Sequence, residues 1–229
     1  MNTKHKKPTL TKKQRHKLRV QQVRRQNIFL TCLFLLIVGC ILLRFSKFSG
    51  RQKETHQINA ACEAYRDEVS SEAAQYDMSD YVDLILAVMM QESSGQGTDP
   101  MQSSEGAYNT RYPQQPNGIT DPSYSISCGI QELKYALEKA VCTGPTDLSK
   151  IRLALQAYNF GADSYFAYLE ENGQTVWTAQ SAQAFAQMAS GGTQRDEDDP
   201  LHDPAGPWDY GDQYYPDHVL RYYHLDNNS

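Results

Sequence analysis

The segment Tyr81-Val-Asp-Leu-Ile-Leu-Ala-Val-Met-Met-Gln-Glu92 is the most apolar part of the chain after residue 45. Its apolar residues recur at spacings of three and four, at Val82, Ile85, Leu86 and Met89. This is the period of one face of an α-helix, and a face so apolar is expected to be buried. The pattern therefore predicts a core helix that ends where Ser93-Ser-Gly95 begins.

Glu92 lies at the end of this helix, three residues after Met89, so its side chain is placed next to the buried face. Desolvation disfavours a charged carboxylate and raises its pKa, and the partial negative charge of a helix C-terminus acts in the same direction. A general acid that works near neutral pH needs such a raised pKa. The alternative is an ordinary solvated residue at a helix end.

Helical spacing and helix-capping residues also predict several further helices. Together with 80–93 they cover residues 59–76, 125–141, 149–160, 162–171, 177–189 and 216–224. Residues 94–124 have no periodic apolar face, and a connection of this length is usually functional or disordered. Residues 190–215 are irregular too. No strand is predicted beyond a short hairpin that 94–124 could contain.

The charge of the chain changes sign along its length. The whole chain has 22 Lys and Arg against 27 Asp and Glu, a formal net charge of −5. Residues 1–27 contain ten basic residues and no acidic one, whereas residues 54–229 contain eight basic residues and all 27 acidic ones. A body so acidic should repel nucleic-acid phosphate, and the basic arm is short. We therefore expect no nucleic-acid partner.

An uncharged stretch separates these two parts. Residues 26–43 would span roughly 27 Å as a helix, close to the hydrocarbon thickness of a bilayer. More basic residues precede the stretch than follow it, which predicts a cytoplasmic N-terminus. We expect a cytoplasmic arm over 1–27, a single transmembrane anchor over 28–45, a stalk over 46–57 and an extracellular domain over 58–226.

Two alternatives to an uncleaved anchor remain open. A cleaved signal peptide would end in small residues, but Arg44-Phe-Ser-Lys-Phe48 offers no Ala-x-Ala-like site. A lipoprotein would carry its lipid on Cys40, because Ile37-Val-Gly-Cys40 resembles a lipobox, although three apolar residues follow it. The pattern favours the anchor.

The cysteines and histidines predict no metal or cofactor site. Cys62, Cys128 and Cys142 contain no Cys-x-x-Cys motif, and the six histidines do not cluster. In an outward-facing domain one disulfide could form, and the sequence does not say which pair it would join. Three free thiols are the alternative.

Four motifs in one order resemble the lysozyme-like domain of CwlT-type cell-wall hydrolases, which is related to goose-type lysozymes and soluble lytic transglycosylases. They are Gln-Glu-Ser-Ser-Gly at 91–95, Asp-Pro-Met-Gln-Ser-Ser-Glu at 99–105, Ala-Leu-Gln-Ala-Tyr-Asn-Phe-Gly at 154–161 and Tyr-Pro-Asp-His-Val-Leu-Arg-Tyr-Tyr at 215–223. The resemblance covers about residues 58–224. It implies a mainly α-helical, lysozyme-like (α+β) fold with a groove for glycan strands.

The resemblance also implies the chemistry. It makes Glu92 the catalytic acid that cleaves the β-1,4 bond between N-acetylmuramic acid and N-acetylglucosamine in peptidoglycan. It assigns substrate contacts to Gln102, Ser103, Tyr158, Asn159 and Tyr215. The family often has Tyr-Val-Pro-His where this chain has Tyr215-Pro-Asp-His218.

The motifs do not fix a second carboxylate. Asp99 and Asp121 each precede a proline, where an aspartate is also common in ordinary turns.

The resemblance leaves three hypotheses for the function. The chain is a muramidase if water attacks the glycosyl centre, and a lytic transglycosylase if the muramic-acid hydroxyl attacks. The third hypothesis is a non-catalytic wall-binding scaffold.

Two biological expectations follow from the same resemblance. Relatives are often encoded with conjugative elements, which suggests a partner in a conjugation or type IV secretion channel. Many relatives carry a peptidase domain after the lysozyme-like one, and we expect that activity to be absent from this chain.

Overall fold

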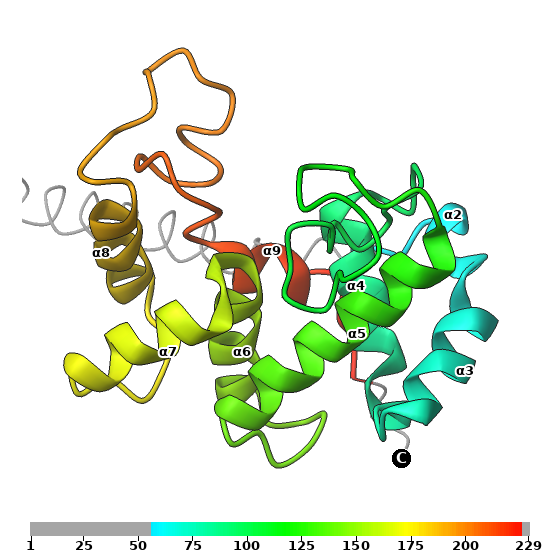
Figure 1. Ribbon diagram of the computed structural model, residues 1–229. Coiled ribbons are helices and arrows are strands. Elements are labelled where there is room, and N and C mark those ends of the chain that lie inside the picture. Colours follow the sequence, from blue (N-terminus) through cyan, green and yellow to red (C-terminus); the bar gives the residue numbers. More distant parts are fainter. Residues whose placement is uncertain (1–55, 226–229) are drawn as a thin grey trace, which may run out of the picture. The chain divides into compact units, whose positions relative to one another are not determined.

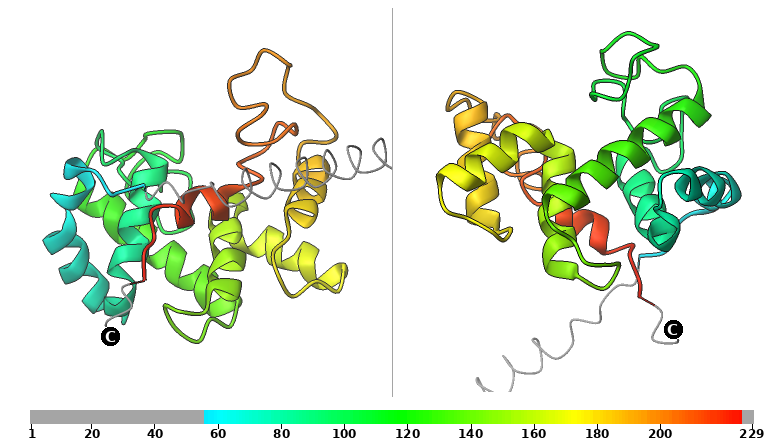
Figure 2. Two further views of the ribbon diagram at one scale, coloured as in Figure 1. Left: turned by 180° about the vertical axis from the view of Figure 1, so that it is seen from behind. Right: turned by 60° about the horizontal axis from the view of Figure 1, so that its bottom comes forward.

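The computed structural model describes residues 56–225. In this range the chain folds into α2 (Ala60–Glu63), α3 (Arg66–Gln75), the 3-10 turn η1 (Ser79–Tyr81), α4 (Val82–Glu92), α5 (Pro122–Lys139), α6 (Leu148–Phe160), α7 (Ala162–Glu171), α8 (Ala179–Ala189) and α9 (Tyr215–Leu220). Helices α3 and α4 lie on one side of α9, and α7 and α8 lie on the other (Figures 1 and 2).

Local sequence explains where the main helices begin and end. Asp121 accepts a hydrogen bond from the Ser123 backbone N–H at the start of α5, and Asp147 does the same for Lys150 at the start of α6. Helix α4 ends at Glu92, where the chain turns at positive φ through Ser94 and Gly95. The predicted core helix therefore ends at the expected place.

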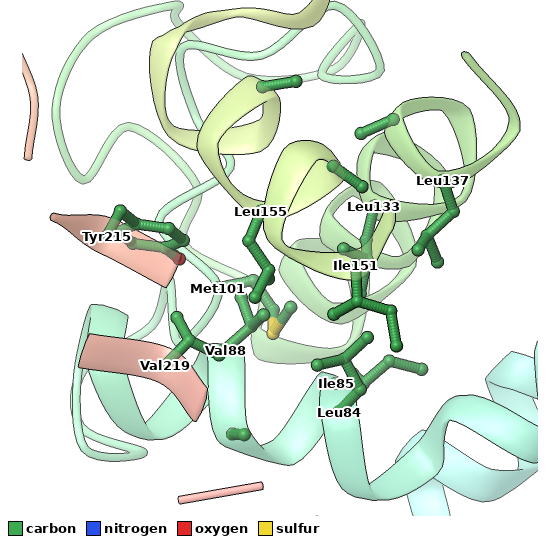
Figure 3. Packing of buried hydrophobic residues seen from close by; sticks show 14 of the residues in the cluster. Leu84, Ile85, Val88, Met101, Leu133, Leu137, Ile151, Leu155, Tyr215 and Val219 are labelled. Atoms are coloured by element: carbon green, nitrogen blue, oxygen red, sulfur yellow. The ribbon is translucent and has the colours of Figure 1, made fainter. Parts of the chain in front are cut away.

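The core is built around α4. All six residues from Leu84 to Met89 are buried. In Figure 3, Val88 of α4, Leu155 of α6 and Val219 of α9 lie together. Met101 lies beside them and belongs to the loop of residues 93–121 between α4 and α5, which we call the loop. Burial of each such side chain contributes about 1.5–3 kcal/mol, so this cluster fixes the end of α4 that carries Glu92.

The structure corrects two of the predicted helices. The helix predicted over 59–76 is two helices, because the chain turns at Ala64 and Tyr65 before α3 packs against α4. The helix predicted to reach residue 224 ends at Leu220.

Residues 56–225 contain no strand, and their only β-bridge pairs Gln194 with Trp208. The β component and the hairpin expected in 94–124 are therefore wrong for this range. In that loop, the buried side chains of Asp99, Ser104 and Asn109 bond the backbone N–H and C=O groups that a partner strand would otherwise pair.

The part of the chain that the structure describes has no helix long and apolar enough to cross a membrane. The predicted arm, the predicted anchor at 28–45 and Cys40 lie outside the described residues, as does nearly all of the predicted stalk. Cys62, Cys128 and Cys142 are free thiols, so no disulfide joins them.

Candidate active site

A groove of about 620 Å³ runs past the end of α4. Its walls come from segments that are far apart in the sequence: Glu92 of α4; Gln102 and residues 105–108 of the loop; Glu132 and Tyr135 of α5; residues 158–164 at the α6–α7 junction; and Tyr210 with Gly211. We call this hollow the groove. Of the residues predicted to form a site, it gathers Glu92, Gln102, Tyr158 and Asn159.

Glu92 is partly buried at the groove wall and accepts a hydrogen bond from the Tyr215 hydroxyl. Burial raises its pKa to about 7. The Tyr215 hydrogen bond acts against this shift, while the negative charges of Asp212, Asp99 and Glu132 add to it. Near neutral pH, much of Glu92 is therefore a neutral acid that can donate a proton.

Two stacked tyrosines support this carboxyl group. The rings of Tyr158 and Tyr215 are 6.3 Å apart between centroids and inclined by 21°. The Tyr158 hydroxyl donates to the Met101 carbonyl oxygen at 2.9 Å, which ties α6 to the loop. Burial raises the pKa of both phenols well above the ordinary value, so both remain hydrogen-bond donors. Tyr215 is only 2% exposed and contacts Glu92 rather than the groove surface.

The loop presents Gln102 to the groove from a strained backbone position. Gln102 has a φ of 48°. Its side-chain amide nitrogen donates to the Asp99 carbonyl oxygen at 2.9 Å and to Asn117 Oδ1 at 3.0 Å. Both bonds restrain the side chain from within the loop, so Gln102 is held in place before any ligand arrives.

Asp99 organises the interior of this loop. It is 1% exposed and accepts hydrogen bonds from the Ser103 backbone N–H at 3.0 Å, from the backbone N–H and hydroxyl of Ser104, and from Ser125 Oγ at 2.6 Å. The Ser103 hydroxyl donates to the Ser125 carbonyl oxygen. Ser103 is therefore buried against α5, and the structure does not bring it to the groove that the resemblance predicted it would line.

Glu132 is a groove residue that the sequence analysis missed. The backbone N–H groups of Ala107 and Tyr108 donate hydrogen bonds to its carboxylate, and burial raises its pKa to about 7. A Cβ atom on Gly106 would lie 1.4 Å from Glu132 Oε1, so any other residue there would displace the carboxylate from this position. The carboxylate thus fastens the loop to α5. In the sequence Glu132 is one polar residue on an amphipathic helix, which gives no sign of this role.

Asp212 is a second missed residue. Its backbone N–H donates to Asn159 Oδ1 at 2.8 Å, and its carboxylate lies 2.5 Å from His218 Nδ1. A Cβ atom on Gly211, at φ 48°, would lie 2.7 Å from Asn159 Oδ1, so glycine is required for this close approach. The side-chain NH₂ group of Asn159 has no hydrogen bond within residues 56–225 and is available to a ligand in the groove.

The described residues contain no group of three or more His, Cys, Asp or Glu side chains that could hold a metal ion. The polar side chains of the groove are carboxyl groups, amides, phenols and one serine hydroxyl. Amides and phenols can both donate and accept hydrogen bonds, which suits a neutral ligand rich in hydroxyl and acetamido groups.

The chain is similar to several known proteins. The family model described as Lysozyme-like matches residues 60–223. The chain is 35% identical over 169 residues to the bifunctional muramidase/DL-endopeptidase CwlT of Bacillus subtilis, covering 74% of this chain and 44% of CwlT. It is 40% identical over 115 residues to the uncharacterized membrane protein YocA of the same organism, covering 48% of this chain and 45% of YocA.

Two further similarities come from other bacteria. A pneumococcal vaccine antigen A homolog of Streptococcus pyogenes is 37% identical over 110 residues, covering 48% of this chain and 50% of the homolog. A crystal structure of a Staphylococcus aureus protein, described as similar to a lipoprotein of the NLP/P60 family, matches with a TM-score of 0.62 and 27% identity. The match covers 76% of this chain and 56% of that protein. The chain therefore spans about half the length of the relatives it matches.

Proposed function

The chain belongs to the lysozyme-like family, and from this membership we propose that it cleaves the glycan strands of peptidoglycan by general-acid catalysis through Glu92. One observation carries the proposal: a partly buried carboxyl group with a pKa of about 7, bonded by a buried tyrosine, borders a groove whose lining includes amides and phenols. CwlT, which is named a muramidase, supports the same reaction class.

In this mechanism Glu92 protonates the oxygen of the β-1,4 bond between N-acetylmuramic acid and N-acetylglucosamine. The bond to the departing sugar breaks, and an oxocarbenium-like centre develops on the other sugar. Gln102 and Asn159 offer amide groups to the sugars, and Tyr158 offers a phenol. Tyr215 acts as a positioning residue, because it bonds Glu92 and is itself buried.

Two other carboxylates near Glu92, those of Glu132 and Asp212, have structural partners. Glu132 accepts bonds from two backbone N–H groups, and Asp212 is bonded to His218 and to the Tyr214 backbone N–H. Their bonds favour a structural role for these two carboxylates, and we propose Glu92 as the catalytic acid. The product is then a reducing sugar if water attacks, as in a muramidase, or an anhydromuramic acid if the muramic-acid hydroxyl attacks, as in a lytic transglycosylase. We propose the muramidase reaction.

The test uses the full-length protein in detergent and purified peptidoglycan, with the released fragments identified by mass spectrometry. Fragments ending in reducing muramic acid are the expected result. Fragments lighter by one water would replace the muramidase assignment with the transglycosylase one. Binding to insoluble peptidoglycan without release of soluble fragments would favour the scaffold hypothesis instead.

The pH dependence of the reaction gives a further prediction. We expect kcat/KM to fall about tenfold per pH unit above pH 7, because the acid form of Glu92 is lost there. In Tyr215→Phe the hydrogen bond that favours the charged form is removed, so the fall should begin at a higher pH. The measurement is kcat/KM between pH 5 and 9.

The control for this prediction is Tyr210→Phe. Tyr210 lines the groove, but its hydroxyl donates to the Phe160 carbonyl oxygen rather than to Glu92. Its pH profile should keep the wild-type midpoint. A Tyr215→Phe profile with an unchanged or lower midpoint would contradict the role given to Tyr215.

The cellular setting is part of the proposal. We propose that residues 28–45 anchor the protein in the cell membrane, with the arm of 1–27 inside and the domain of 58–226 outside, where peptidoglycan lies. The name of YocA as a membrane protein supports an anchored relative. A partner in a conjugation or type IV secretion channel stays a prediction from the resemblance.

A further inference from the structure

A second hollow of about 540 Å³ adjoins the groove. Ala107 and Tyr108 line both, so this stretch of the loop forms the wall between them. The second hollow is also lined by Tyr76, which follows α3, and by Tyr124 of α5. A ligand bound in the groove could therefore reach this hollow by crossing two residues of the loop.

Arg111 is the basic residue of the second hollow, and its side chain is held in an unusual way. Its guanidinium carbon lies 4.5 Å from the centroid of the Tyr124 ring. The Tyr124 hydroxyl accepts a hydrogen bond from the Thr110 backbone N–H and donates one to the Tyr108 carbonyl oxygen. Stacking of this kind orients a guanidinium group and leaves its N–H donors unused.

The backbone of Arg111 is also fixed. The buried Asn109 side chain accepts hydrogen bonds from the backbone N–H groups of Arg111 and Tyr112 and donates to the Ser104 carbonyl oxygen at 2.7 Å. The turn that presents Arg111 is therefore tied to the same loop interior that holds Gln102 at the groove.

Within residues 56–225, Arg111 differs from the other Lys and Arg residues. Each of the others has an ion-pair or hydrogen-bond partner there: Arg66, Lys134, Lys139 and Arg152 bind carboxylates; Lys150 and Arg195 bind backbone carbonyl oxygens; and Arg221 binds Gln91. The Arg111 guanidinium has no such bond in that range, although this part of the chain is rich in carboxylates.

The acidic residues of the same hollow are already engaged. Asp121 caps α5 through the Ser123 backbone N–H, and Glu72 accepts a bond from Gln75. Neither lies within ion-pair distance of Arg111. An oriented guanidinium with free donors is suited to bind a carboxylate through two parallel N–H···O bonds.

We propose that Arg111 and the second hollow form a subsite for a carboxylate of the stem peptide carried by muramic acid on a strand bound in the groove. This rests on the proposed function, because it takes peptidoglycan as the ligand of the groove. The muramic-acid lactyl group links a sugar to a peptide with free carboxylates, so one substrate could fill both hollows. The protein would then prefer peptide-bearing strands to bare ones.

The test compares three substrates with the full-length protein in detergent. They are peptide-bearing strands, the same strands after an amidase has removed the peptides, and strands whose stem-peptide carboxylates have been converted to amides. We expect kcat/KM to be at least about tenfold higher on the first than on the other two. In Arg111→Met this ratio should fall to near one, and Arg111→Lys should restore part of it.

Lys150→Met is the matched control, because it removes the same unit of positive charge from a residue that lines neither hollow. Its substrate ratio should equal that of the wild type. A wild type without preference, a preference that amidation leaves intact, or an Arg111→Met variant that keeps the wild-type ratio would each overturn the proposal.

Binding separates this proposal from the proposed function. Affinity for peptide-bearing and bare strands is measured with Glu92→Gln and with the Glu92→Gln/Arg111→Met double variant. If the wild type cleaves nothing, the proposed function fails, while a preference for peptide-bearing strands that depends on Arg111 still supports the subsite. If binding shows no such dependence, the subsite fails whatever the cleavage result.

Discussion

Glu92→Gln should lower the rate of peptidoglycan cleavage by about 10²–10⁴-fold, which is the usual contribution of a general acid. Glutamine keeps the size of the side chain and an oxygen that can accept the Tyr215 hydrogen bond, but it has no proton of suitable acidity to donate. The measurement is release of soluble fragments at pH 6, where the wild-type acid is protonated.

The same substitution should make the domain more stable at high pH. The pKa of Glu92 is about 7 in the folded protein and near 4.5 when the carboxyl group is solvated. The folded state therefore binds this proton more tightly, and its stability falls as the pH rises from 4.5 through 7. A shift of this size corresponds to about 3 kcal/mol, so Glu92→Gln should raise the free energy of unfolding by up to about that amount at pH 8.

At pH 4 the same comparison should show little difference, because Glu92 is protonated in both states there. Denaturation by urea at the two pH values is the measurement. Glu105→Gln, an exposed groove residue, is the control and should change the free energy of unfolding by less than about 0.5 kcal/mol. An inactive Glu92→Gln protein that is also less stable at pH 8 would contradict the catalytic assignment, since it would indicate a structural role.

Asp99→Ala should have the largest effect on stability. It removes a buried carboxylate that accepts bonds from Ser103, Ser104 and Ser125, and leaves their donors unpaired away from water. Buried unpaired donors cost about 1–3 kcal/mol each, so we expect the free energy of unfolding to fall by at least about 3 kcal/mol. Cleavage should fall as well, because the Asp99 carboxylate holds together the interior of the loop that presents Gln102 to the groove.

Asp121→Ala is the matched control, because Asp121 is the other aspartate of the loop that precedes proline. It caps α5 at a partly exposed position, and its loss should cost only about 1 kcal/mol. Urea denaturation and fragment release are measured for both variants. If Asp99→Asn kept the wild-type stability but abolished cleavage, Asp99 would act as a catalytic base rather than as the support of the loop.

Much of the fold could be predicted because it depends on local patterns. The apolar spacing of residues 82–89 places α4 and its end at Glu92. The helix predicted over 125–141 is α5, although Asp121 caps it and it begins at Pro122. The turn at Ala64 and Tyr65 has no such mark. It depends on how α3 packs against α4, which is a tertiary effect.

The site could be predicted only in part, for the same reason. The helix made Glu92 a candidate acid with a solvated residue as the alternative, and the family resemblance decided between them. Gln102, Tyr158 and Asn159 were proposed from the resemblance. Glu132 and Asp212 belong to the site through tertiary contacts, because residues 107 and 108 pack against α5 and Asp212 bonds Asn159 of α6. Helical periodicity in the sequence does not indicate these contacts. Ser103 was predicted to contact substrate because it follows Gln102 in the same motif, but its side chain faces the loop interior instead of the groove.

The contact between Tyr215 and Glu92 also affects the order in which the site can be completed. The two residues are 123 positions apart, and the tyrosine belongs to α9, the last helix of the described chain. A ribosome finishes the glutamate long before the tyrosine, so a growing chain carries the acid without the side chain that orients it. On the proposed mechanism, competence for catalysis is thus acquired only after α9 has been made, when nearly the whole described domain is available to fold.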